Sequence, residues 1–192
     1  MKIVFASNNQ NKVKEIQNQV PSFIEIVTLE DIGCTEDIEE TGETIEENAI
    51  IKANYVTTKY NLPCFADDTG LEIHALNGAP GVYSARYAGE EKNADKNMEL
   101  VLKNLDSLDD RTAQFKTVIA LNINNEQHLF TGIVKGEIRK EKTGNNGFGY
   151  DPIFEPEQLG KTFAEMTMEE KNTMSHRGRA VAQLIDFLTN LK

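Results

Sequence analysis

Two adjacent carboxylates, Asp67 and Asp68, end an apolar run at Phe65-Ala66 and precede Thr69-Gly70. Adjacent acids at the end of a strand repel each other, and a raised pKa or a bound cation relieves the repulsion. Mg²⁺ prefers one or two carboxylates together with water and phosphate oxygens. A second acid, Glu40, precedes a Thr-Gly turn that can aim its carboxylate inward, and Lys52 is the nearest cation in the following helix. The pattern predicts a magnesium site, with a structural turn as the equally weighted alternative.

The segment 7–12 joins an apolar strand to a helix and is polar throughout. A helix N-terminus presents N–H groups and a partial positive charge, both of which favour phosphate. Lys12 adds a full positive charge in the first turn. Neither standard glycine-rich phosphate motif is present, and an Asn before a helix is most often only a cap. The candidate phosphate-binding residues are Ser7, Asn8, Asn9, Gln10, Asn11 and Lys12.

Two further segments could recognise a flat heterocycle. In the glycine-rich stretch 144–154, aromatic rings stand beside an acid, and rings of this kind stack on nucleobases. The stretch 171–179 concentrates positive charge in an otherwise acidic protein and is expected to lie at the start of a helix. The alternatives are a glycine-rich hairpin loop with packed aromatics and a surface segment that balances nearby acids.

The elements that must hold these residues read as a mixed-sheet α/β fold. Strands are expected at 2–6, 24–28, 65–68 and 71–76, and a hairpin at 113–138 around Asn124-Asn125-Glu126. A helix is expected to begin near Thr44, where Thr44-Ile45-Glu46-Glu47 forms a capping box. Further helices are expected after the first strand, near 94–105 and at the end of the chain. Early alternation of helices and strands followed by a long hairpin favours a mixed sheet over a purely parallel one.

Composition excludes several classes. The 192 residues carry 20 Lys+Arg against 31 Asp+Glu, a formal charge of −11, which argues against general binding of nucleic acid or anionic membranes. We expect one domain over residues 1–192. No apolar run approaches the length of a signal core or a membrane span. Cys34 and Cys64 are expected to be reduced, and the cytoplasm is the expected compartment.

Together these segments resemble the inosine triphosphate pyrophosphatase family, which hydrolyses non-standard purine nucleoside triphosphates. Thr69 departs from the Ser found there in many members, and a hydroxyl is kept. Any one segment would be a weak match, whereas the set in family order is specific. The matching stretches are SNNQNKVKE (7–15), EETGETIEENAIIKA (39–53), ADDTGLEIHALNGAPGVYSARYAG (66–89), NGFGYDPIF (146–154) and EKNTMSHRGRA (170–180).

The resemblance implies two lobes around a central cleft, a homodimer, and Mg²⁺-dependent cleavage of ITP, dITP or XTP to the monophosphate and pyrophosphate. It implies that Glu40 and Asp68 bind the metal and that Asp68 is also the proton acceptor for water. Two rivals remain open: a pyrophosphatase acting on pyrimidine triphosphates, and a nucleotide sensor without turnover. The residues implied to contact the substrate are Ser7 to Lys12, Lys52, Asp67, Thr69, Phe148, Gly149, Tyr150, Asp151, Lys171, His176 and Arg177.

Overall fold

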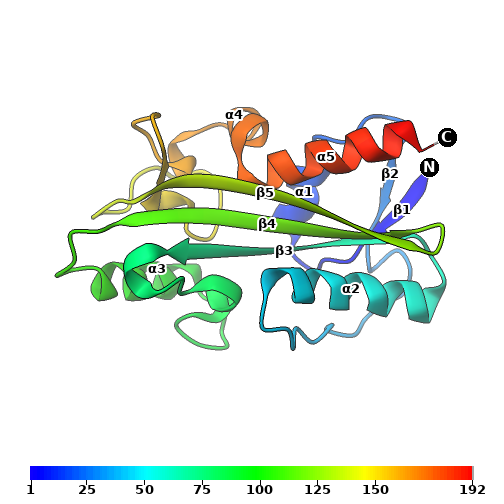
Figure 1. Ribbon diagram of the computed structural model, residues 1–192, viewed down its shortest axis with the longest axis horizontal. Helices are drawn as coiled ribbons and strands as arrows, with labels where there is room; N and C mark the ends of the chain where they lie inside the picture. Colours follow the sequence, from blue (N-terminus) through cyan, green and yellow to red (C-terminus); the bar gives the residue numbers. More distant parts are fainter. Residues whose placement is uncertain (192) are drawn as a thin grey trace. The chain divides into compact units, whose positions relative to one another are not determined.

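The computed structural model describes residues 1–191, in which helices and strands alternate along most of the chain (Figure 1). The strands are β1 (Lys2–Phe5), β2 (Glu25–Val27), β3 (Cys64–Ile73), β4 (Thr112–Ile123), β5 (Glu126–Ile138) and β6 (Phe154–Pro156). The α-helices are α1 (Gln10–Gln17), α2 (Ile45–Tyr60), α3 (Ala94–Asn104), α4 (Met168–Met174) and α5 (His176–Asn190). Short 3₁₀ segments lie at His74–Leu76, Gly81–Arg86, Asp151–Ile153 and Phe163–Glu165.

The strands form one six-stranded sheet in the order β2-β1-β3-β4-β5-β6. β1 pairs in parallel with both β2 and β3, whereas β5 and β6 are antiparallel. The two residues between β4 and β5, Asn124 and Asn125, have φ of 52° and 63°. Positive φ at both central positions is the geometry of a two-residue hairpin turn, and Asn tolerates it well. The mixed α/β sheet with flanking helices confirms the predicted fold class.

The chain divides into two compact units. Unit 1 comprises residues 1–68, 117–132 and 177–192, and unit 2 comprises 69–116 and 133–176. Strands β3, β4 and β5 each contribute residues to both units. A single domain over residues 1–192 stays a prediction.

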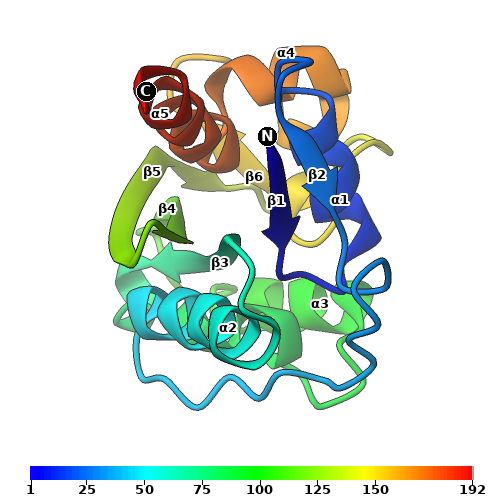
Figure 2. The same ribbon diagram turned by 90° about the vertical axis from the view of Figure 1, so that its right-hand side faces the viewer.

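In unit 1, α2 and α5 lie on opposite sides of the strands (Figures 1 and 2). Phe5 and Phe65 stack at the centre, with ring centroids 4.8 Å apart. Residues such as Val13 and Ile16 of α1, and Val181 and Leu184 of α5, complete this core. Helix α5, expected at the end of the chain, therefore buries the side that carries Val181 and Leu184.

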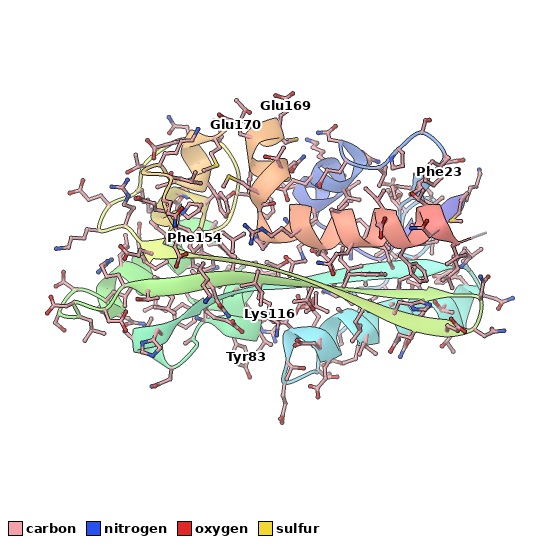
Figure 3. The ribbon with its side chains drawn as sticks, turned by 45° about the horizontal axis from the view of Figure 1, so that its top comes forward. Phe23, Tyr83, Lys116, Phe154, Glu169 and Glu170 are labelled. Atoms are coloured by element: carbon pink, nitrogen blue, oxygen red, sulfur yellow. The ribbon has the colours of Figure 1, made fainter. Side chains whose placement is uncertain are left out.

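In unit 2, α3 and α4 lie on opposite sides of the strands (Figure 1). Its core is aromatic: Phe115 meets Phe154 edge-on, with ring centroids 4.7 Å apart, and Phe163 lies beside both. Glu169 and Glu170, in the first turn of α4, are exposed and project away from the strands (Figure 3).

Local predictions from the sequence have mixed outcomes. The capping box is confirmed, because Thr44 Oγ1 accepts from the N–H of Glu47 and the Glu47 carboxylate accepts from Thr44 N–H. The two strands expected at 65–68 and 71–76 are instead one strand, β3, followed by a 3₁₀ turn at His74. Helix α4, which has its own Thr167–Glu170 capping box, was not predicted. Both cysteines are free and buried, and no helix within residues 1–191 is long and apolar enough to cross a membrane.

Candidate functional site

Strand β3 separates the two acids of the Asp-Asp pair. Successive side chains of a strand point to opposite faces, so the neighbours meet different partners. Asp67 Oδ1 lies 3.0 Å from Lys12 Nζ, whereas Asp68 Oδ1 lies 3.5 Å from Lys52 Nζ. Both acids are buried, Asp67 completely and Asp68 with 7% of its surface exposed. The pair therefore serves two clusters, and both belong to unit 1.

The first cluster is a buried network of two cations and two anions. The other carboxylate oxygen of Asp67, Oδ2, accepts from Arg177 Nε at 3.0 Å. The guanidinium also donates through Nη1 to Glu15, a buried acid of α1. Burial alone would raise the pKa of Asp67, but Lys12 and Arg177 outweigh it and hold that pKa well below its usual range. Burial lowers the pKa of Lys12, and Asp67 opposes that shift.

The second cluster places a lysine between two carboxylates. Lys52 Nζ donates to Glu40 Oε1 at 2.5 Å and to Asp68 Oδ1 at 3.5 Å. Burial raises the pKa of Asp68, although Lys52 and Lys12 work against that shift. For Lys52 the effect of burial is outweighed by Asp68 and Glu40, so its pKa is raised. The second oxygen of Asp68, Oδ2, is buried without a hydrogen-bond partner.

The position of Glu40 depends on how the following turn packs on α2. Gly42 N–H donates to Asn48 Oδ1 at 2.8 Å. A Cβ on Gly42 would lie 2.6 Å from Glu47 Cβ and 2.7 Å from that same oxygen, so the turn needs glycine for this close approach. Glu47 caps α2, while Glu36 is an exposed partner of Lys59. Of the acids in the 36–47 stretch, Glu40 is the one that the structure joins to Lys52.

The segment 7–12 forms the cap of α1. Asn9 Oδ1 accepts from the N–H groups of Asn11 at 3.0 Å and Lys12 at 3.4 Å, and Ser7 Oγ accepts from Asn9 N–H at 3.2 Å. Asn8 and Gln10 are exposed. Asn9 therefore caps α1, as the alternative interpretation of this segment predicted. Lys12, in the first turn, places its ammonium group in the buried network with Asp67.

In unit 2, the glycine-rich stretch and the basic segment meet at one acid. Asp151 Oδ2 accepts from Lys171 Nζ and from Phe148 N–H, both at 2.7 Å. Lys171 Nζ also lies 4.7 Å from the centre of the Phe148 ring, a cation–π contact. The loop 144–149 and the start of α3 line a cavity of about 440 Å³ in this unit, and Phe148 and Gly149 belong to its wall.

The remaining predicted residues of unit 2 lie near its core. Tyr150 is 5% exposed, and its hydroxyl donates to the Ser84 carbonyl at 2.7 Å. His176 is 3% exposed and stacks on Phe115 with ring centroids 4.5 Å apart. Thr69 is half-buried in β3. Their predicted contacts with a nucleotide stay predictions.

The carboxylates of Glu40 and Asp68 could hold a divalent cation only together with ligands from outside the protein. Within residues 1–191, no three His, Cys, Asp or Glu side chains are grouped closely enough to form an all-protein metal site. Glu40 and Asp68 supply two carboxylates, and Asp68 Oδ2 is an acceptor without a protein donor. A hard cation that keeps water and phosphate oxygens among its ligands fits this set, and Mg²⁺ is such a cation.

Sequence reasoning missed Glu15 and Asn48. Both are polar residues on the buried side of a helix: Glu15 lies beside Val13 and Ile16 in α1, and Asn48 lies beside Ala49 in α2. A polar residue inside an apolar stripe is the signal that could have found them, because burial requires a partner for its polar atoms.

Residues 3–187 match the sequence model of the Ham1 family. The dITP/XTP pyrophosphatase of Flavobacterium johnsoniae is 65% identical over all 192 residues and 100% of both chains, and that of Flavobacterium psychrophilum is 63% identical over 99% of this chain and 100% of the relative. The solved structure of the Staphylococcus aureus Ham1 protein is 44% identical, covers 100% of both chains and superposes with a TM-score of 0.91. The chain belongs to the Ham1 family.

Proposed function

We propose that this chain is a nucleoside triphosphate pyrophosphatase that hydrolyses dITP, XTP and ITP to the nucleoside monophosphate and pyrophosphate. Full-length relatives at 65% and 63% identity bear the name dITP/XTP pyrophosphatase. The observation that carries the chemistry is the Glu40–Lys52–Asp68 cluster, in which one carboxylate oxygen of Asp68 is buried without a partner. Removal of such nucleotides keeps them out of DNA and RNA.

The cations of unit 1 are proposed to bind the triphosphate. In this structure, ion pairs with Asp67 and Glu40 hold the ammonium groups of Lys12 and Lys52. These two positive charges are therefore in position before the substrate binds. Fixed charges need no reorganisation when negative charge develops on phosphate oxygens. In-line displacement at a phosphorus atom needs chiefly positioning and charge stabilisation of this kind.

Asp68 is proposed to accept the proton of the attacking water. An ordinary Asp is a weak base at neutral pH, and burial raises the pKa of Asp68, which makes the carboxylate a better proton acceptor. Asp67 is not suited to that task, because its two neighbouring cations hold its pKa low. Its proposed role is to orient Lys12.

Mg²⁺ is the proposed cofactor, held by Glu40 and Asp68. When bound, it would polarise phosphate oxygens and lower the pKa of attacking water. Lys52 Nζ lies between these carboxylates, 2.5 Å from Glu40 Oε1 and 3.5 Å from Asp68 Oδ1, so a cation bound here would compete with this ammonium group for those two oxygens.

The purine base is proposed to contact Phe148, Gly149 and Lys171 of unit 2. Hypoxanthine and xanthine present an O6 acceptor and an N1–H donor, the reverse of adenine. Lys171 is a donor and Asp151 an acceptor, and mispaired polar groups can reduce turnover by a factor of roughly 10⁴. Arg177, which the resemblance implies contacts the substrate, donates to Asp67 through Nε and to Glu15 through Nη1 in this structure.

The test is pyrophosphate release from ITP, XTP, dITP, GTP, ATP and dTTP, each with Mg²⁺ and with chelator. We expect fast release from ITP, XTP and dITP that chelator abolishes. Activity confined to dTTP would instead support the pyrimidine enzyme, and tight ITP binding without release would support the sensor. Asp68→Asn should bind substrate but lose turnover; near-normal turnover would show that Asp68 is not the base.

A homodimer is also proposed, on the resemblance alone, and sedimentation of the purified chain tests it. The cytoplasm is proposed as its compartment, where the nucleotide pool lies. Both cysteines being free is consistent with a reducing compartment.

A further inference from the structure

Asn48 is a buried amide whose two ends have different surroundings. Only 1% of its surface is exposed. Its oxygen accepts from Gly42 N–H at 2.8 Å, whereas its nitrogen, Nδ2, is buried without a hydrogen-bond partner. A buried amide NH₂ group without an acceptor destabilises the fold, so its presence here calls for an explanation.

Its place on α2 indicates what the nitrogen could serve. Asn48 is four residues before Lys52, and residues i and i+4 of a helix lie on the same face, one turn apart. Lys52 contacts Glu40 and Asp68 from that face. The Gly42 turn that Asn48 holds is also the turn that follows Glu40. Asn48 is thus connected to the carboxylate cluster through both the helix and the turn.

We propose that Asn48 is a further substrate-binding residue of this enzyme: Oδ1 fixes the Glu40–Gly42 turn, and Nδ2 donates to an anionic oxygen of the bound triphosphate. An NH₂ group has no lone pair available for a cation, so it cannot ligate Mg²⁺. It suits a phosphate oxygen, and the interaction would provide the missing partner. The inference rests on the proposed function.

The side-chain amide resonances of ¹⁵N-labelled protein report on this hydrogen bond directly. Those of Asn48 are identified by their loss in Asn48→Asp. The probe is α,β-imido-dITP with Mg²⁺, which the enzyme cannot cleave at that bond. We expect the Asn48 NH₂ protons to move downfield and to exchange more slowly with solvent when the probe binds, and to move little with Mg²⁺ alone.

Asn54 provides the matched control. It lies on the same helix, is exposed, and its Oδ1 accepts from Asn122 and Gln127, so Asn54→Asp makes the same chemical change outside the cluster. Calorimetry should show roughly 10- to 100-fold weaker probe binding for Asn48→Asp and Asn48→Ala, the range expected for a lost hydrogen bond to a charged group, and unchanged binding for Asn54→Asp. Asn48→Ala should also weaken binding of Mg²⁺ alone, because the Glu40 turn loses its anchor.

The outcomes separate the two proposals. Binding of the probe without movement of the Asn48 NH₂ resonances would refute the donor role and leave the proposed function intact. Weaker probe binding in Asn48→Asp but not in Asn48→Ala would reflect the added negative charge alone, and would likewise refute it. Failure of the wild-type protein to bind the probe would refute both. Urea unfolding of each variant, followed by circular dichroism, establishes that the proteins compared are folded.

Discussion

Asp67→Asn tests whether the buried network of unit 1 is held together by charge. Asp67 is completely buried between Lys12 Nζ and Arg177 Nε, each 3.0 Å from one of its oxygens. With Glu15, the four groups carry two positive and two negative charges. The substitution keeps the size of the side chain and one acceptor oxygen, but leaves one excess positive charge.

The magnitude follows from two independent estimates. Breaking a buried ion pair by removing one partner typically costs about 3–5 kcal/mol. The protein can also relieve the excess charge by deprotonating Lys12, whose ordinary pKa is 10.5. Relative to the unfolded chain, in which that ordinary pKa holds, deprotonation at pH 7 costs about 3.5 pKa units at 1.36 kcal/mol each, or about 5 kcal/mol, which is an upper limit on the penalty. We expect a loss of about 3–5 kcal/mol in the free energy of unfolding at pH 7.

The pH dependence distinguishes charge from packing. Burial already lowers the pKa of Lys12 in the folded protein, and without Asp67 it falls further. Between the folded pKa and 10.5 the unfolded chain binds more protons, so stability rises with pH there. This interval extends to lower pH in the variant, so the stability deficit of the variant should shrink as pH rises.

Urea unfolding between pH 7 and pH 9 measures both effects. At a slope of about 2 kcal/mol per molar urea, the expected midpoint shift at pH 7 is roughly 1.5–2.5 M. Asp109→Asn, an exposed acid outside the network, controls for the change in net charge and should leave the midpoint in place. A shift below about 0.5 M, or a deficit independent of pH, would refute the reasoning.

Three further outcomes are expected. Thr44→Ala removes the oxygen that accepts from Glu47 N–H and should destabilise the protein by about 1 kcal/mol in urea unfolding, whereas an unchanged midpoint would mean that α2 does not need this cap. Gly147→Ala places a Cβ 2.1 Å from Asp151 Oδ2, whereas a Cβ on Gly78, also at positive φ (+85°), would have no atom within 4 Å. Gly147→Ala should therefore lower the urea midpoint of unfolding more than Gly78→Ala does. Equal losses would show that backbone strain alone destabilises both variants. Burial raises the pKa of Asp68 in the metal-free protein, so the affinity for Mg²⁺ alone should fall with decreasing pH with a midpoint above pH 3.8, and a midpoint below that pH would contradict Asp68 as a metal ligand.

Much of the fold was predictable because its signals are local. The Thr44 cap and the hairpin at Asn124-Asn125 each depend on a few adjacent residues, and both form where expected. The division of β3 into two strands was wrong because Asp67-Asp68-Thr69-Gly70 reads as a turn in isolation. In the structure, Lys12, Arg177 and Lys52 contact the two acids, so the backbone continues as a strand.

The sequence predicted which residues form the candidate site, but only some of the contacts between them. The sequence placed Glu40 with Lys52, and the structure joins them at 2.5 Å. The pairing of Arg177 with Asp67, 110 residues away in the chain, and with Glu15 was not predicted, and the contact of Arg177 with the substrate stays a prediction. Ion pairs between residues so far apart depend on how the strands are ordered in the sheet, and residue spacing does not encode that order.

The two lysines of unit 1 show why a charged cluster can persist without a ligand. Each buried carboxylate needs a counter-charge, and Lys12 and Lys52 provide it within the protein. Lys52 serves two acids at once, so a divalent cation that took over Glu40 and Asp68 would release the ammonium group with its charge intact. The released charge would then be available for a phosphate oxygen. Substitution of Lys52 by Met should therefore strengthen binding of Mg²⁺ alone while weakening binding of the triphosphate, and parallel loss of both would contradict this exchange of partners.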